Sequence, residues 1–494
     1  MKKRVLLITP PFHAGVVEVA GRWVPLHLVY LAGSLKEAGY EPIIYDAMTK
    51  MVGHREIEKK IEELKPHYVA TTSITCTLPD ALEILKRAKK VEPSIKTIIG
   101  GIHPTFMYEE VLGLSEYVDY IVRGEGERTI VELLHCLEAG REPAGVKGLA
   151  YRSGGKVVVT EERQLMSPEE LDSLPKAWEL LDWEDYRYFV IPDSRLGALD
   201  TSRGCNKECS FCSQRMFWRQ TWRPRSPESL VEDIRVQHHR FGVNVVLLTD
   251  DYPTYDRERW ERFLDLLIEE SLDVFILMET RVEDILRDRD ILHKYRKAGV
   301  IHIYVGIESG EQSTIDVFKK DISVADAKTA LRLLNDHGII TETSLILGLP
   351  EDTIESIEKN LKMAVEYNPD FCHFLAIAPW PYAEMYETLS PYIKVKDYRR
   401  YNLIDPVVKP ENLSLEEIDR AIVDCYRRFY MGKLREVVSI KDDFKRDYML
   451  EAMRLMMRSS FLVEKMGDLG KVPEEVEKYL GIMREKAEKK KAAM

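Results

Sequence analysis

The sequence predicts an α/β protein with two parallel sheets in succession and a helical region after them. Strand-like runs alternate with helical patterns over residues 1–145, and the same alternation returns over residues 196–385. A chain of 494 residues is also too long for one hydrophobic core. We therefore expect a doubly wound, Rossmann-like domain (1–145), a connector with a hairpin (146–195), a barrel-like layer of βα units (196–385) and a helical domain (386–494).

The N-terminal alternation places a row of small and polar residues at one sheet edge. Strand-like runs are expected at 4–9, 42–47, 68–73, 97–101 and 119–123. Ligands of parallel sheets bind beyond the carboxyl ends of the strands, where glycines admit a ligand to the backbone. The candidate ligand contacts there are Pro10, Pro11, Thr71, Thr72, Ser73, Gly100, Gly101, His103, Gly124, Glu125 and Gly126. They predict a nucleotide-like pocket without a G-x-G-x-x-G motif, or else ordinary turn glycines of an α/β domain.

The connector begins with two strand-like runs around Ser-Gly-Gly over 148–159, which is a hairpin pattern. Residues 165–192 have no period and are expected to wrap between the domains. Trp178, Trp183 and Tyr186 in this stretch either pack against a neighbouring surface or border a large flat ligand.

Three cysteines with the spacing C-x3-C-x2-C are the strongest chemical signal: Cys205, Cys209 and Cys212. Three thiolates on one loop can hold three corners of a [4Fe-4S] cluster, which leaves the fourth iron open for a ligand. A zinc site is disfavoured because the sequence has no second C-x2-C or H-x3-H pair. Disulfides are disfavoured because the number of cysteines in the loop is odd. The remaining cysteines are interpreted as small buried side chains: Cys76, Cys136, Cys372 and Cys425.

The layer after the cysteine loop also delivers polar residues and glycines to successive strand ends. Chemistry in barrels of βα units collects at the carboxyl ends of the strands. The residues at these ends are Asp250, Asp251, Glu279, Arg281, Gly306, Glu308, Gly348 and Trp380. Each residue alone could belong to a loop turn or be a surface charge, but such residues at the ends of five successive strands favour a shared site.

The cysteine loop and the strand pattern resemble the radical S-adenosylmethionine (SAM) superfamily. The resemblance implies a six-unit partial barrel in which SAM binds the open iron and is cleaved to a 5′-deoxyadenosyl radical. It places Phe211 beside the adenine and Asp250-Asp251 where a glycine-rich motif holds the amino group, although the acidic pair departs from that motif. Arg281 and Glu308 then become candidates for the carboxylate and ribose, and Gly348 for close approach to the adenine.

The N-terminal layer resembles the cobalamin-binding domain found ahead of many radical SAM enzymes. The D-x-H-x-x-G motif, whose histidine ligates cobalt in other cobalamin proteins, is absent, and His54 and His103 stand in other contexts. The resemblance therefore implies cobalamin without that lower ligand. His103 is either a corrin contact or a loop histidine satisfied within the protein.

A broader resemblance, over about residues 1–430, is to the anaerobic magnesium-protoporphyrin IX monomethyl ester oxidative cyclases. It is carried by these segments: 20–25, 30–33, 46–49, 100–103, 105–108, 203–205, 209–214, 217–219 and 379–381. It implies formation of the isocyclic ring of protochlorophyllide with oxygen from water, with a porphyrin substrate and an electron donor such as flavodoxin or ferredoxin. A cobalamin-dependent radical SAM C-methyltransferase and a non-catalytic corrinoid carrier are the alternatives.

Composition and charge limit the partners and the cellular location that we expect. The net charge of −12 argues against a nucleic-acid partner, which needs a basic surface. No apolar run reaches the ~18 residues of a membrane span, and the apolar run at the start is too short for a signal peptide. We expect a cytoplasmic protein. Helical patterns at 413–428, 442–465 and 473–490 predict a C-terminal domain that closes one side of the barrel.

Overall fold

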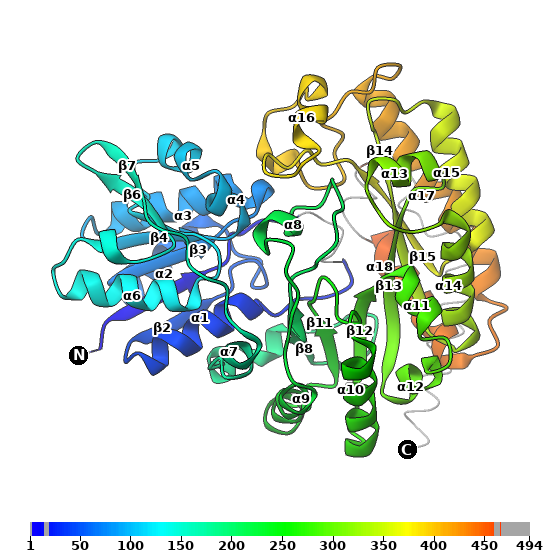
Figure 1. Ribbon diagram of the computed structural model, residues 1–494, viewed down its shortest axis with the longest axis horizontal. Coiled ribbons are helices and arrows are strands. Elements are labelled where there is room, and N and C mark those ends of the chain that lie inside the picture. Colours follow the sequence, from blue (N-terminus) through cyan, green and yellow to red (C-terminus); the bar gives the residue numbers. More distant parts are fainter. Residues whose placement is uncertain (1, 14–18, 459–464, 466–494) are drawn as a thin grey trace.

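The computed structural model describes residues 2–13, 19–458 and 465, and contains two sheets that lie beside each other (Figure 1). The N-terminal sheet has the order β2-β1-β3-β4-β5-β6-β7, and its first five strands are parallel. Its strands are β1 (Arg4–Ile8), β2 (Glu41–Tyr45), β3 (Tyr68–Thr72), β4 (Lys96–Gly100), β5 (Tyr120–Val122), β6 (Leu149–Ser153) and β7 (Lys156–Val159). Its helices are α1 (Leu26–Glu37), α2 (His54–Leu64), α3 (Leu78–Val91), α4 (Ile102–Phe106), α5 (Tyr108–Leu114) and α6 (Glu127–Glu138).

Helices cover both faces of the N-terminal sheet because successive strand residues point to opposite sides. Val5 and Leu7 of β1 belong to the core beneath α1 and α6, whereas Leu6 and Ile8 belong to the core beneath α2, α3 and α5. The expected doubly wound arrangement is therefore confirmed.

The hairpin expected in the connector forms as β6 and β7, but it belongs to the N-terminal sheet. β6 pairs antiparallel with β5, with Tyr120 opposite Tyr151, and β7 pairs antiparallel with β6. Backbone hydrogen bonds therefore continue past residue 145. We propose that the N-terminal domain ends at Val159.

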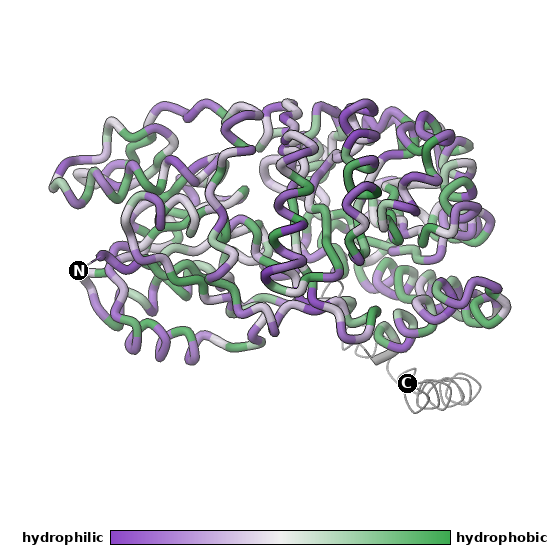
Figure 2. Tube along the Cα trace, turned by 90° about the horizontal axis from the view of Figure 1, so that it is seen from below, coloured by the Kyte–Doolittle hydropathy of each residue, from purple (hydrophilic) through white to green (hydrophobic). Residues whose placement is uncertain are grey.

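The second sheet has six parallel strands in the order β15-β14-β13-β12-β11-β8, so β8 and β15 form its two edges. The strands are β8 (Leu196–Leu199), β11 (Val245–Leu248), β12 (Phe275–Thr280), β13 (Val300–Glu308), β14 (Ile340–Leu347) and β15 (Phe371–Ala376). The helices between them are α9 (Pro227–Phe241), α10 (Arg257–Glu270), α11 (Val282–Arg287), α12 (Leu292–Lys297), α13 (Gln312–Val317), α14 (Val324–Asp336) and α15 (Ile354–Tyr367). This is the expected six-strand partial barrel. Its helices alternate hydrophilic and hydrophobic residues along their length (Figure 2).

The stretch between the sheets packs against protein, which was the first of the two alternatives for its aromatic residues. Short helical turns η4 (Trp178–Leu180) and η5 (Trp183–Asp185) follow α7 (Pro168–Asp172). Trp183 stacks on Phe241 of α9 with ring centroids 5.0 Å apart. The wrapping segment therefore joins the two domains through buried aromatic contacts.

The C-terminal part contains α16 (Tyr386–Leu389), the turns η6 (Ser390–Tyr392) and η7 (Tyr398–Arg400), α17 (Leu415–Val437) and α18 (Asp443–Arg458). Ser414 caps α17 and forms a capping box with Glu417, and α17 continues well beyond the expected 413–428. Met449 and Met453 of α18 are buried in the barrel core. The helix expected at 473–490 lies outside the described residues. None of the helices in the described ranges is both long and apolar enough to cross a bilayer.

Candidate functional site

A cavity of about 490 Å³ lies where the carboxyl ends of the two sheets face each other. From the N-terminal sheet it is lined by Thr71, Thr72, Gly100, Gly101, Gly124, Glu125 and Gly126, and from the barrel by Asp250 and Asp251, all of which the sequence had singled out. Residues that the sequence did not mark also line it, chiefly His27, Arg203, Phe217 and Trp218. The cavity therefore joins the N-terminal candidates to Asp250 and Asp251 of the barrel. The remaining barrel candidates do not line it: Cys205, Cys209, Phe211, Cys212, Arg281, Glu308 and Gly348.

Four candidates from the N-terminal loops do not line this cavity: Pro10, Pro11, Ser73 and His103. Ser73 and His103 have no exposed surface. The His103 Nδ1 atom lies 3.1 Å from Thr75 Oγ1, and its ring packs edge-on against Tyr382 and Tyr398. Burial lowers the His103 pKa to about 4. Residues far along the chain therefore cover the His103 ring, which favours the second alternative, a loop histidine held within the protein, over a corrin contact.

Gly101 fixes the shape of the N-terminal side of the cavity. Its φ is +97°, and a Cβ atom would lie 2.5 Å from Ser73 O and 2.7 Å from Thr72 Oγ1. Only glycine fits where the loop after β4 touches the loop after β3. At Gly124 a Cβ atom would meet nothing within 4 Å, so the cavity is open above its backbone. Gly101 therefore allows the two loops to pack closely, and Gly124 leaves its backbone open to a ligand in the cavity.

The cysteine loop lies between β9 (Ser202–Arg203) and the short helix α8 (Gln214–Phe217) and is anchored on both sides. Ser210 N donates to Phe318 O over 2.9 Å, and Met385 N donates to Ser210 O over 3.1 Å. Cys209 is buried, while Cys205 and Cys212 are half-buried.

The buried surroundings of these thiols disfavour the thiolate form unless a positive charge lies beside it. Burial raises the pKa of Cys205 to about 11 and that of Cys212 to about 12. Iron would supply the missing positive charge. Among the described residues, no three His, Cys, Asp or Glu side chains gather as ligands of a single metal ion. In a cubic cluster, by contrast, each thiolate binds a different iron, so the three side chains do not have to meet at one metal ion. The loop therefore fits a cluster with three cysteine ligands.

The two aspartates after β11 have different environments. Asp250 accepts hydrogen bonds from Thr201 N, Thr201 Oγ1 and Ser202 Oγ, each over 2.7 Å, so it anchors the start of the cysteine loop. Burial raises its pKa to about 6. Asp251 is half-buried, and burial together with the charge of Asp250 raises its pKa to about 7. Asp251 is therefore the better candidate for a ligand contact.

The other barrel candidates lie at or just after the ends of β12, β13 and β14, and Arg281 lies beside the cysteine loop. Arg281 Nη1 lies 4.0 Å from Cys209 Sγ, and its buried Nη2 has no hydrogen-bond partner in the described part of the chain. Glu308 has a positive φ of +69° and accepts a 2.6 Å hydrogen bond from Lys320 Nζ. Gly348 has φ +88°.

Phe211, the candidate for the adenine contact, is half-buried. Its ring meets Phe318 edge-on, with centroids 5.0 Å apart. It therefore belongs to a small apolar cluster beside the cysteine loop.

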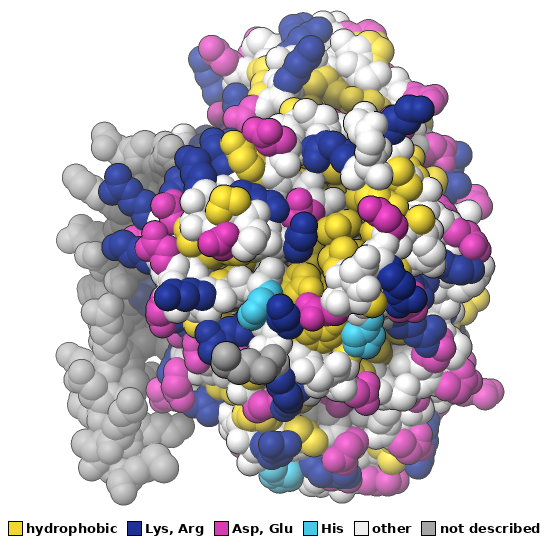
Figure 3. Space-filling view, turned by 90° about the vertical axis from the view of Figure 1, so that its left-hand side faces the viewer, with side chains coloured by type: hydrophobic (Ala, Val, Ile, Leu, Met, Phe, Trp, Pro, Cys, Tyr) yellow, Lys and Arg dark blue, Asp and Glu magenta, His cyan; other side chains and the backbone are white. Residues whose placement is uncertain are grey.

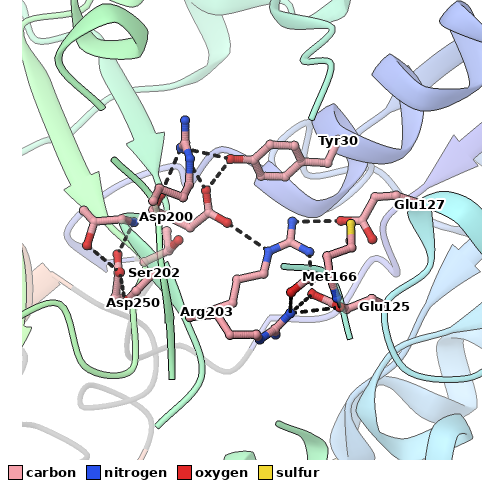
Figure 4. Close-up of polar contacts among 12 residues, drawn as sticks. Tyr30, Glu125, Glu127, Met166, Asp200, Ser202, Arg203 and Asp250 are labelled. Carbon is pink, nitrogen blue, oxygen red and sulfur yellow. Dashed lines mark hydrogen bonds and ion pairs between the residues drawn. The ribbon is translucent and has the colours of Figure 1, made fainter. Parts of the chain in front are cut away.

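Arg203, which the sequence did not mark, joins the two domains through buried ion pairs (Figure 4). Its guanidinium donates to Glu125 Oε1 over 3.0 Å, to Glu127 Oε1 over 2.8 Å and to Asp200 Oδ2 over 3.1 Å. Glu125 also accepts from Arg223 over 2.9 Å. The Glu125 carboxylate lines the cavity, but it is already paired with Arg203 and Arg223. It therefore holds the two domains together.

A second cavity of about 360 Å³ lies inside the barrel, and Thr249 lines both cavities. Its polar residues are Glu279, His302, Tyr304, Glu342, His373, Tyr188 and Tyr448. Burial opposes the ionisation of Glu342, but His302 and His373 outweigh it and hold its pKa below the usual range. The Glu279 side chain, by contrast, has no hydrogen-bond or ion-pair partner among the described residues. Burial and the charges of Asp251 and Asp250 raise its pKa to about 8.

Comparison with known proteins identifies the two halves of the chain. Residues 12–134 match the family model described as B12 binding domain, and residues 199–364 match the radical SAM superfamily. The chain is 38% identical to the anaerobic magnesium-protoporphyrin IX monomethyl ester cyclase of Rubrivivax gelatinosus, over 95% of this chain and 85% of that one. The chain belongs to the family of this cyclase. It is thus a radical SAM enzyme with a B12-binding domain.

Other members of this wider group are methyltransferases by name. An uncharacterised methyltransferase of Pyrococcus horikoshii is 29% identical over 90% of this chain and 95% of that one. The solved structure of the radical SAM methyltransferase TsrM from Kitasatospora setae, with cobalamin and a [4Fe-4S] cluster bound, has a TM-score of 0.65 at 17% identity. It covers 85% of this chain, and this chain covers 82% of it. At that identity the likeness shows the shared fold.

Sequence reasoning missed His27 and Arg203 and gave Glu279 no role of its own. His27 is an isolated histidine in an apolar helical pattern, which gives no signal of a ligand contact. Arg203 stands two residues before Cys205, in the segment 203–205 that carries the family resemblance, but neither signal assigned it a role at the site.

Proposed function

We propose that this enzyme is an oxygen-independent oxidative cyclase that converts magnesium-protoporphyrin IX 13-monomethyl ester to protochlorophyllide, with the new oxygen taken from water. The observation that carries the proposal is the 38% identity to the Rubrivivax gelatinosus cyclase over 95% of the chain. The match extends through both domains and the C-terminal helices, rather than through the cysteine loop alone. It therefore supports the substrate class as well as the cofactors.

In this proposal Cys205, Cys209 and Cys212 hold the [4Fe-4S] cluster, and Arg281 and Glu308 contact SAM. When bound, the cluster and SAM supply the radical chemistry that removes hydrogen from the esterified propionate arm. Arg281 beside Cys209 Sγ offsets thiolate charge, and its free Nη2 donor suits the carboxylate of SAM. Asp251, Phe211 and Gly348 complete the proposed contacts.

Cobalamin is proposed to lie on the N-terminal side of the interdomain cavity. The hydroxyl and glycine residues there present backbone and small side chains to a broad ligand: Thr71, Thr72, Gly100, Gly101, Gly124 and Gly126. The ion pairs of Arg203 with Glu125 and Glu127 keep this surface against the barrel. The two domains then enclose the reacting groups and exclude water.

Glu279 is the proposed proton-transfer residue. Conversion of a methylene to a carbonyl with oxygen from water releases protons, so a nearby group must accept them. Glu279 faces the barrel cavity without a protein partner, and its raised pKa, about 8, keeps it able to exchange a proton near neutral pH. Tyr304 and Thr249 line the same cavity.

The electron donor is proposed to be a small reducing protein such as flavodoxin or ferredoxin. We also propose a cytoplasmic location, because the seven cysteines are all free thiols and an exposed cluster needs a reducing compartment. On the side of the N-terminal domain, acidic and basic side chains are interspersed (Figure 3).

The test is an anaerobic incubation of the reconstituted enzyme with the magnesium porphyrin ester, SAM and a reductant in ¹⁸O-water. The proposal predicts a cyclised product that carries one ¹⁸O atom, together with 5′-deoxyadenosine. A methylated product and S-adenosylhomocysteine would instead establish the second candidate, a cobalamin-dependent C-methyltransferase. That candidate is favoured by the 29% identity to the Pyrococcus horikoshii methyltransferase. Release of 5′-deoxyadenosine would eliminate a non-catalytic carrier.

A further inference from the structure

His27 is an unpartnered imidazole inside the interdomain cavity. It lies in the first turn of α1, between Leu26 and Leu28, which are buried in the domain cores. Its own side chain is exposed, and it lines the cavity. Within the described part of the chain, no hydrogen bond, ion pair or ring contact joins it to another residue. Its exposed surface therefore faces the cavity, where the imidazole is available to a ligand.

The His27 imidazole has the chemistry of a metal ligand. A neutral imidazole carries a lone pair on one ring nitrogen and is a common metal ligand in proteins.

Asp46 is a buried carboxylate whose negative charge acts on His27, although no hydrogen bond joins the two side chains in the described part of the chain. It is 4% exposed and is held in place by neighbouring groups. Asp46 Oδ1 accepts from Thr9 Oγ1 over 2.7 Å and from Thr49 N over 3.2 Å, and Oδ2 accepts from Tyr186 OH over 3.2 Å. Its charge acts on His27 and favours a more basic ring nitrogen.

No other lining residue offers cobalt a comparable ligand. Among the described residues that line the cavity, His27 is the one imidazole, and none is cysteine or methionine. The carboxylates of Glu125 and Glu127 are paired with Arg203. Asp251 comes from the barrel side, beside the cysteine loop, whereas His27 comes from the N-terminal domain.

We propose that His27 is the lower axial ligand of the cobalt in bound cobalamin. The helix start after β1 thus supplies the nitrogen that the absent D-x-H-x-x-G motif provides elsewhere, and this revises the expectation of a lower face without a histidine. The inference rests on the proposed cobalamin site. An axial nitrogen stabilises the cobalt oxidation states that take axial ligands, so it would lower the cobalt reduction potential.

The test is the electron paramagnetic resonance spectrum of the full-length protein loaded with cobalamin and reduced to the Co(II) state. Cobalamin is kept at natural isotope abundance, and the protein is prepared with either ¹⁴N or ¹⁵N histidine. We expect a three-line nitrogen splitting that becomes two lines in the ¹⁵N protein. His27→Ala and His27→Gln should retain cobalamin and lose the isotope-dependent splitting, whereas His135→Ala, an exposed position on α6, should leave it unchanged.

Three results would overturn the inference. A splitting that does not respond to ¹⁵N histidine would assign the axial nitrogen to the cofactor's own base. A spectrum without nitrogen splitting would leave water or no ligand at that face. In both cases the cobalamin site itself would stand. Wild-type protein that takes up no cobalamin would remove the site and the ligand together.

Discussion

The two sheet edges that face each other across the interdomain cavity are built differently. On the N-terminal side the cavity is lined by glycines and threonines, and its carboxylates are occupied by Arg203 and Arg223. On the barrel side, by contrast, Asp251 lines the cavity, and the buried Arg281 Nη2 atom near the cysteine loop has no hydrogen-bond partner among the described residues. In the proposed function, one edge receives a broad ligand by shape, and the other receives a small charged ligand by its side chains. Changes of charge should matter most at the barrel edge, and changes of size at the N-terminal edge.

The largest effect is expected from the cysteine loop. Cys209→Ser should abolish the iron content and the visible absorbance of the reconstituted protein, because it removes one of three cluster ligands. SAM cleavage should fall to background. The control is Cys136→Ser, whose hydroxyl can replace the thiol hydrogen bond to Arg141 O. Retention of a full cluster in Cys209→Ser would contradict the ligand assignment.

The next effect is expected from the ion pairs between the two edges. Glu125→Ala should lower the free energy of unfolding by about 3–5 kcal/mol, because it leaves the buried Arg223 without its carboxylate partner and removes one of the three carboxylates around Arg203. Chemical denaturation of the anaerobic protein measures this. Glu161→Ala, which breaks an exposed pair with Lys147, should cost less than about 1 kcal/mol. Equal losses in the two variants would show that the buried pairs do not hold the domains together.

A smaller, selective effect is expected at the N-terminal edge. Gly100→Val should weaken cobalamin binding roughly ten- to hundredfold, because overpacking a site typically costs about 1–3 kcal/mol. The backbone at Gly100 should tolerate the change, since a Cβ atom would lie 3.4 Å from Val122 O. Iron content should remain at the wild-type level. Gly113→Val, at an exposed position on α5 where a Cβ atom meets nothing within 4 Å, should leave cobalamin binding unchanged.

The last effect concerns Glu279 and is confined to the pH dependence of stability. Its pKa is raised from 4.5 to about 8, so the folded protein holds this proton where the unfolded chain releases it. The stability from this group is complete below pH 4.5 and is lost as the pH rises towards about 8. The wild type should therefore lose stability more steeply than Glu279→Gln across that window. Parallel pH profiles in denaturation experiments would exclude the raised pKa.

Local patterns in the sequence were sufficient to predict both sheets and the cysteine loop. Strands and helices can be recognised from the local periodicity of their hydrophobic residues, and the C-x3-C-x2-C spacing lies within one loop. Asp251 and Arg281 could be selected because the carboxyl ends of parallel strands meet at one edge.

Contacts between segments that are distant in the chain could not be predicted from local sequence patterns. His103 seemed available from its loop, but Tyr382 and Tyr398 cover it, and they lie almost three hundred residues further along the chain. The pairing of Arg203 with Glu125 likewise joins two domains. His27 stands in an apolar pattern, and only the three-dimensional arrangement turns it towards the cavity.

The most direct test of the central claim is whether SAM binds an iron that the three cysteines leave open. The anaerobic protein should be reduced and examined by electron–nuclear double resonance with SAM labelled with ¹⁵N at its amino group. We predict a ¹⁵N coupling to the cluster that disappears in Cys209→Ser. A cluster that shows no coupling to the bound, labelled SAM would contradict the account.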